Sequence, residues 1–272
     1  MPFFMIILVS LVQGITEFLP VSSSGHLVLL PILTDQPYQG RTIDVAAHVG
    51  TLFAVMVFLR FEIIRIVTGL VSFGRHNESD AQLGLTLIAA TIPVIAAGHY
   101  VNYADWPWLT MIETLAWSNL IFAVLLWGAD HFGVTIKNMG AMRFSSALFI
   151  GLAQICALVP GASRSGVTMT AARILGFDRI AAARFSLLLS LPTIAGAGLL
   201  KTLDLVKSGD ATLGADVLIV AVLSAGFAWL AIRWMMRWLA RAGFGIFVYY
   251  RLALGGLLLL ALAQGWVTPN IS

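Results

Sequence analysis

The sequence predicts an all-α polytopic membrane protein, an inverted-topology repeat with about six full transmembrane helices and two re-entrant helix-loop-helix hairpins. Three observations lead to this prediction: the composition, a series of long apolar stretches, and two apolar stretches that polar residues interrupt. Of the 272 residues, 59% are hydrophobic and 11% are charged, whereas ordinary soluble domains carry about 25% charged residues. So few charges cannot cover a water-facing surface, which excludes a soluble enzyme and a disordered chain.

Six stretches are long and apolar enough to cross a bilayer completely. They are predicted at 43–60, 81–101, 107–129, 179–200, 214–238 and 245–266. The connecting loops predict the orientation, because arginine and lysine gather on the cytoplasmic side of membrane proteins. Loops 60–80, 130–143 and 233–241 carry arginines and are expected inside, whereas the loop around Asp105 is expected outside. The basic pI of about 9.3 follows from this asymmetry and does not indicate a nucleic-acid partner.

The two interrupted apolar stretches, 3–30 and 144–176, contain related motifs. Ser-Ser-Ser-Gly at 22–25 corresponds to Ser-Arg-Ser-Gly at 163–166, and each follows a proline and a polar residue in an apolar run. Two further matches follow in the same order. They pair 44–48 with 178–184, and 91–96 with 190–195.

These matches indicate a duplication within a single membrane domain, 1–272, with repeats at 1–136 and 137–272. Three crossings follow each serine motif, so the second repeat is inverted relative to the first. In inverted-repeat proteins the binding site lies near the midplane, on broken helices. The interrupted stretches are therefore predicted to be hairpins that enter from opposite faces and carry the motifs at their tips.

The hairpin tips concentrate polar groups that are costly inside a membrane and therefore indicate a functional site. In the first stretch these groups are Gln13, Glu17, Ser22, Ser23, Ser24, Gly25 and His26. In the second they are Ser163, Arg164, Ser165, Gly166 and Thr168, with Arg173 a few residues further on. An arginine fork binds phosphate in a bidentate manner, and hydroxyls with backbone N–H groups at a helix start form an anion nest. We expect a phosphoryl ligand.

A serine nucleophile needs an adjacent base. His26 lies three residues from Ser23 in the sequence, and Glu17 is a second candidate. Glu17 can hold a divalent cation, orient His26 or act as the base itself, and spacing alone does not choose among these roles. Asp44 and His48 share a helix face and are expected to form a structural hydrogen bond.

At this point the motifs QGITEFLPVSSSGH (13–26) and PGASRSGVT (160–168) resemble those of the undecaprenyl-diphosphate phosphatase family, which is linked to bacitracin resistance. The resemblance runs over nearly the whole chain. It implies a multi-pass enzyme of the bacterial inner membrane that hydrolyses undecaprenyl diphosphate to the monophosphate and phosphate. This reaction recycles the lipid carrier of cell-wall synthesis.

The resemblance also implies roles for individual residues. Ser23 would be the nucleophile beside His26, and Arg164 would bind phosphate with Ser163 and Thr168. The acidic motif lands on Gln13 and Glu17, and the family is activated by Mg²⁺ or Ca²⁺. That motif is often written with two glutamates, so Gln13 is a departure. Its amide oxygen can still ligate a metal, but it brings no charge and cannot act as a base, which leaves the acid–base or metal work to Glu17 alone.

Two alternatives stay open at this level. Within the phosphatase interpretation, either Ser23 attacks phosphorus or a water activated by Glu17 or His26 does so. Outside it, an inverted repeat with a midplane anion site also describes a transporter or flippase of a phosphorylated lipid or anion. The expected partner is a polyprenyl diphosphate lipid, and a homodimer is one oligomeric state open to the chain.

Overall fold

The computed structural model describes residues 1–75, 77–104, 106–208 and 214–268, and within them it is helical, with no strands. Asp105, used above for orientation, lies outside these residues. Six helices are long and apolar enough to span a membrane, which confirms the predicted fold class. They are α3 (Arg41–Phe58), α5 (Glu78–Ala104), α6 (Ile112–Phe132), α9 (Arg179–Ser208), α10 (Ala215–Leu239) and α11 (Gly245–Ala263).

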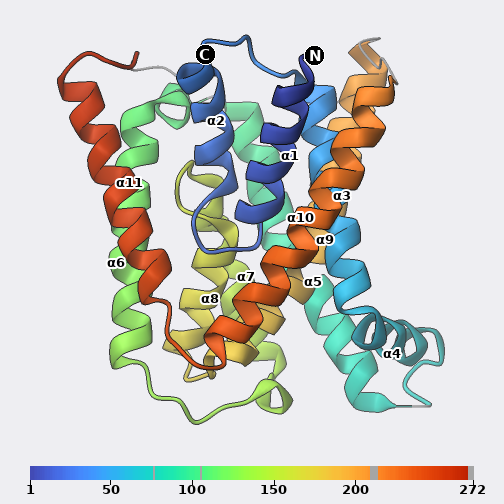
Figure 1. The fold of residues 1–272 in the computed structure, drawn as a ribbon. Helices are drawn as coiled ribbons and strands as arrows, with labels where there is room; N and C mark the ends of the chain where they lie inside the picture. The colour runs from blue at the N-terminus through green and yellow to red at the C-terminus, as the bar shows by residue number, and fades with distance from the viewer. Residues whose placement is uncertain (76, 105, 209–213, 269–272) are drawn as a thin grey trace.

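Four shorter helices form the two predicted hairpins. The first pairs α1 (Phe3–Thr16) with α2 (Ser23–Thr34), and the second pairs α7 (Phe144–Ala153) with α8 (Arg164–Ile174). Figure 1 shows the α1–α2 hairpin entering from the end of the bundle that holds the N-terminus, and the α7–α8 hairpin entering from the opposite end. Both turn back inside the bundle, so the irregular backbone of each tip is enclosed by the long helices.

The two tips share an unusual local geometry. Ser22 precedes α2 with φ 72° and ψ 92°, and Ser163 precedes α8 with φ 69° and ψ 111°. Serine rarely adopts positive φ, which costs on the order of 1–3 kcal/mol and persists only where the surroundings impose it. In both tips the serine hydroxyl also contacts the serine two residues on, at 3.3 Å for Ser22–Ser24 and 3.2 Å for Ser163–Ser165. This equivalence supports the proposed duplication, while the boundary between 136 and 137 stays a prediction.

Close helix contacts hold the first hairpin against the bundle. A Cβ added at Gly14 of α1 would lie 2.6 Å from the Phe227 side chain, and one at Gly50 of α3 would lie 2.1 Å from the Ala221 carbonyl oxygen. Phe227 and Ala221 both belong to α10. Only glycine allows α1 and α3 to approach α10 this closely.

One helix was not predicted. Residues Arg60–Val71 form α4, although their charges had predicted part of a basic loop. The helix is amphipathic, since Ile66 and Gly69 are buried while Arg60 and Arg65 are exposed. A Cβ at Gly69 would lie 2.7 Å from the Ala81 backbone, so α4 packs tightly against α5. The predicted crossing at 107–129 also starts later, because a 3₁₀ turn at Pro107–Thr110 precedes α6.

Candidate active site

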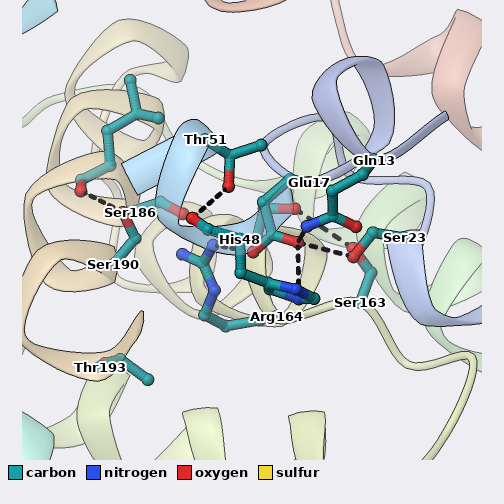
Figure 2. Close-up of polar contacts among 12 residues, drawn as sticks. Gln13, Glu17, Ser23, His48, Thr51, Ser163, Arg164, Ser186, Ser190 and Thr193 are labelled. Atoms are coloured by element: carbon teal, nitrogen blue, oxygen red, sulfur yellow. Dashed lines mark hydrogen bonds and ion pairs between the residues drawn. The ribbon is translucent and has the colours of Figure 1, made fainter. Parts of the chain in front are cut away.

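The carboxylate of Glu17 is the centre of the polar cluster where the two tips meet (Figure 2). Glu17 caps the C-terminal end of α1 and is nine-tenths buried. Its Oε2 accepts hydrogen bonds from Ser23 Oγ at 2.7 Å and from Gln13 Nε2 at 2.9 Å. His48 Nε2, on α3, lies 3.8 Å from the same oxygen. The position of Gln13 four residues before Glu17 places both side chains on one face of α1.

Arg164 reaches Glu17 from the opposite hairpin. It is the first residue of α8, and its Nη2 donates to Glu17 Oε1 at 2.9 Å. Its guanidinium carbon lies 5.7 Å from the centre of the Phe18 ring. The other terminal nitrogen, Nη1, is buried and has no partner among the described residues. Nη2 therefore pairs with the carboxylate, and Nη1 is available to bind an anion.

These groups line a cavity of about 270 Å³. Its polar wall consists of Glu17, Ser22, Ser23, Ser24, His48, Gln154, Ser163, Arg164 and Thr193. The rest of the lining is apolar and comes from Val45, Val94, Ala157, Leu158, Ile194, Ala197 and Gly198. A polar wall with one carboxylate, one guanidinium and several hydroxyls facing small apolar side chains suits a phosphorylated lipid.

His26 occupies a different place from the one expected. Its Nδ1 contacts the Ser22 carbonyl oxygen at 2.7 Å, and its Nε2 contacts the Tyr250 hydroxyl at 2.5 Å. The His26 and Tyr250 rings also stack, with centroids 5.5 Å apart. His26 bends back to the carbonyl four residues earlier, which turns the ring toward α11 and away from the cavity. The hydroxyl of Ser23 donates to Glu17 instead. The expected pairing of Ser23 with His26 is therefore wrong.

The remaining predicted ligands divide into two groups. Ser22, Ser24 and Ser163 line the cavity, and the Ser163 hydroxyl accepts from Gly166 N at 3.2 Å as the cap of α8. The hydroxyls of Ser165 and Thr168 instead have structural partners. Ser165 donates to the Leu19 carbonyl at 2.8 Å, and Thr168 contacts Ser186 at 2.7 Å.

The two motif glycines differ in how closely their surroundings pack. A Cβ at Gly25 would make ordinary contacts, 3.5 Å from Leu115, whereas one at Gly166 would lie 2.8 Å from Arg251 Nη1. Arg173, the other charged residue of the second stretch, pairs with Asp130 at 3.2 Å. Asp130 belongs to α6, and Arg173 does not line the cavity.

Four residues of the site or its support were not predicted from the sequence: His48, Gln154, Thr193 and Arg251. His48 does make the expected structural bond, from its ring to the Asp44 carbonyl oxygen at 2.7 Å, but it also lines the cavity beside Glu17. Thr193 lines the cavity from α9, seven residues after Ser186 on the same face. Arg251 of α11 lies within the predicted crossing 245–266. An arginine inside a membrane-spanning stretch is costly, and this was the signal that could have identified it.

Arg251 holds the tip of the second hairpin, the loop before α8, through hydrogen bonds to its backbone. It is fully buried, and its Nη2 donates to the carbonyl oxygens of Gly161 and Ala162 at 2.9 and 3.0 Å. Its Nε donates to Asn119 Oδ1 at 2.8 Å. These bonds fix the backbone just before Ser163.

Substituting Arg251→Met is expected to lower the free energy of unfolding by about 3 kcal/mol or more, because three buried acceptors lose their donor. The measurement is the thermal unfolding midpoint in detergent. Arg233→Met is the matched control, since Arg233 is an exposed arginine of the neighbouring α10 whose guanidinium lies over Trp229. Equal midpoints for the two variants would contradict a bracing role for Arg251.

Comparison with known proteins gives a consistent result. The sequence model of the family described as bacitracin resistance protein BacA matches residues 6–257. The chain is 45% identical over 264 residues to a protein of Ruegeria pomeroyi named undecaprenyl-diphosphatase, covering 95% of this chain and 98% of the relative. A protein of Alcanivorax borkumensis with the same name is 43% identical over 265 residues, covering 97% and 100%. With nearly its whole length matched and the motifs of both tips gathered around one cavity, the chain belongs to the BacA family.

Proposed function

We infer that this membrane protein hydrolyses undecaprenyl diphosphate to undecaprenyl phosphate and inorganic phosphate. The names of its relatives and the family support the reaction, and the cavity suits the substrate. The product is the lipid carrier in the form that cell-wall synthesis reuses, and the activity fits the link of the family to bacitracin resistance. No observation favours the transporter or flippase alternative.

The observation that best supports the chemistry is the bond from Ser23 Oγ to Glu17 Oε2 at 2.7 Å. In the proposed reaction Glu17 takes the Ser23 proton as Oγ attacks the terminal phosphorus. The bond from that phosphorus to the bridging oxygen breaks, and undecaprenyl phosphate leaves. Nη1 of Arg164 supports the equatorial oxygens of the phosphoryl group. Glu17 passes the proton it took from Ser23 to the departing undecaprenyl phosphate. A water then attacks the phosphoserine and gives a proton to Glu17, which returns it to Ser23 Oγ as the phosphorus–Oγ bond breaks and phosphate is released.

The test is phosphate release from undecaprenyl diphosphate by the purified protein in detergent. Substituting Ser23→Ala is expected to lower kcat by about 100-fold, with residual activity because Arg164 and Glu17 can still position and activate a water. Acid-quenched protein should carry substrate-derived phosphate in the wild type and none in the variant. Wild-type turnover by Ser23→Ala would show that water attacks directly.

A divalent cation is proposed as the cofactor, following the family resemblance. The described residues contain no group of three or more His, Cys, Asp or Glu side chains placed to hold a metal. The nearest oxygen donors are the Glu17 carboxylate, which lines the cavity, and the unpartnered Oε1 of Gln13, whose amide bonds Glu17 but which does not itself line the cavity. With so few protein ligands, a Mg²⁺ or Ca²⁺ ion would take its other ligands from the diphosphate and water. When bound, it would neutralise charge on the diphosphate.

Chelation with EDTA is therefore expected to abolish most activity, and added Mg²⁺ or Ca²⁺ is expected to restore it. Substituting Gln13→Met removes the neutral oxygen donor while retaining side-chain length. It is expected to raise the Mg²⁺ concentration for half-maximal activity about tenfold, the effect of weakening one ligand. Full activity in EDTA would contradict the cation, and an unchanged Mg²⁺ requirement in the variant would remove Gln13 as a ligand.

We also propose a membrane orientation and an oligomeric state. The basic loops support insertion in the bacterial inner membrane with the Arg60–Arg75 and Arg233–Arg241 ends in the cytoplasm. Cysteine labelling from either side of intact cells tests this orientation. A homodimer is tested by light scattering of the protein in detergent, with the detergent mass subtracted.

A further inference from the structure

Gln154 is a buried amide of the cavity wall that the mechanism above does not use. It follows α7 directly and begins the 3₁₀ turn Gln154–Leu158, and its side chain is fully buried. It lines the same cavity as Glu17 and Arg164. Its Nε2 donates to Thr193 Oγ1 at 3.2 Å, whereas its Oε1 has no partner among the described residues.

The hydrogen bonds of Thr193 determine which way this amide faces. The hydroxyl of Thr193 donates its only proton to the Leu189 carbonyl oxygen, 2.8 Å away. Thr193 Oγ1 can then only accept, so it needs the NH₂ group of Gln154 and not its oxygen. The pair therefore holds the amide with its oxygen turned away from Thr193.

A second glutamine stands at the equivalent place in the other hairpin. Gln13 and Gln154 each lie nine residues before the positive-φ serine of their tip, Ser22 and Ser163. Both are fully buried, both donate through Nε2, and both have an unpartnered Oε1. Leaving a buried amide oxygen unpaired costs stability. Gln154 lines the cavity whereas Gln13 does not, so a molecule bound in the cavity can pair with the oxygen of Gln154.

We propose that Gln154 Oε1 accepts a hydrogen bond from an O–H group of the molecule in the cavity, and that Thr193 is the residue that orients it. Among the buried side-chain atoms of the described residues that line the cavity, one donor, Arg164 Nη1, and one acceptor, Gln154 Oε1, have no partner. A phosphate oxygen satisfies the donor, because it accepts from the guanidinium. A phosphate oxygen without a proton cannot satisfy the acceptor.

Two sources supply the required O–H group, and both rest on the proposed function. One is a protonated oxygen of the terminal phosphate, in which case Gln154 selects the substrate form that retains one proton. The other is the attacking water, in which case Gln154 places that water for reaction. The first acts on substrate binding and the second on turnover, so kinetics separates them.

The test compares Gln154→Met with the wild type. Methionine keeps the length and volume of the side chain but removes the amide. We expect kcat/KM for phosphate release to fall about 10- to 100-fold, the effect of losing one hydrogen bond to a charged or reacting group. If the phosphate O–H is the donor, KM rises, and the difference from the wild type shrinks above about pH 6, where the second phosphate proton is lost. If water is the donor, kcat falls and KM does not change.

Two further variants exclude a merely structural effect. Thr193→Val frees the amide to rotate and should lose part of the activity, whereas Thr193→Ser retains the hydroxyl and should lose less than Thr193→Val. Gln39→Met is the matched control, because Gln39 also has a buried unpartnered Oε1 and donates to Asp44 but does not line the cavity. It should be fully active. Wild-type kcat and KM in Gln154→Met, or an equal loss in Gln39→Met, would overturn the inference.

A binding measurement separates this inference from the proposed function. The rise in thermal midpoint caused by methylenediphosphonate, a diphosphate that is not hydrolysed, reports binding without turnover. If the wild type releases no phosphate, the proposed function fails, and a smaller midpoint rise in Gln154→Met still supports the phosphate O–H contact. If the wild type is inactive and the two proteins show the same rise, both ideas are wrong.

Discussion

Substituting Glu17→Gln is expected to lower kcat for phosphate release by about 10⁴-fold, the upper end of the range for a general base. The substitution keeps the shape of the side chain. It removes the charge that accepts the Ser23 proton and that pairs with Arg164 at 2.9 Å. Steady-state phosphate release at saturating substrate measures the effect.

Because Glu17 also partners a mostly buried guanidinium, the variant needs a stability control. Losing one member of a buried ion pair leaves the other uncompensated, so the thermal midpoint is measured together with kcat. Substituting Glu62→Gln gives a matched comparison, since Glu62 pairs with Arg184 at 2.5 Å and does not line the Glu17 cavity. If Glu17→Gln folds and retains kcat within tenfold, Glu17 is not the base.

Substituting Arg164→Ala is expected to lower kcat/KM by about 10³- to 10⁵-fold, the effect of losing an arginine that stabilises a transferring phosphoryl group. Its Nη1 is the buried donor left without a partner, while Nη2 holds the Glu17 carboxylate. The variant therefore loses both the phosphate contact and the partner that orients Glu17.

Arg164→Lys is the informative companion. Lysine keeps the charge but cannot contact the carboxylate and a phosphate oxygen with a rigid fork, so only part of the activity should return. Arg184→Ala is the control and should keep near-wild-type kinetics, because Arg184 lies near the N-terminal end of α9, outside the cavity, and pairs with Glu62. Full activity of Arg164→Lys would mean that charge alone suffices, and an active Arg164→Ala would move the phosphate site elsewhere.

The sequence was sufficient to predict the membrane class and the parts of the site. Six apolar stretches and two interrupted ones correspond to six long helices and two hairpins. This works because about 20 consecutive apolar residues are enough to cross the hydrocarbon core of a bilayer, whatever the rest of the fold. Glu17, Ser23 and Arg164 were identified because polar groups in an apolar stretch are costly. The amphipathic α4 was missed because its charges resembled those of a loop.

The tertiary structure alone decided which of these groups meet. Ser23 and His26 are three residues apart, yet the ring of His26 bonds to Ser22 and Tyr250 while Ser23 bonds to Glu17. Arg164 reaches Glu17 across 147 positions of sequence.

The sequence does not show which way the side chains of His48, Gln154 and Arg251 point, because each residue has apolar neighbours in the chain. Their direction depends on how separate helices pack, and packing is set by contacts such as Gly50 against Ala221 that no local pattern encodes. The sequence therefore determined that the protein spans a membrane and carries polar hairpin tips, and the packing of the helices decided which base, which donor and which amide face the cavity.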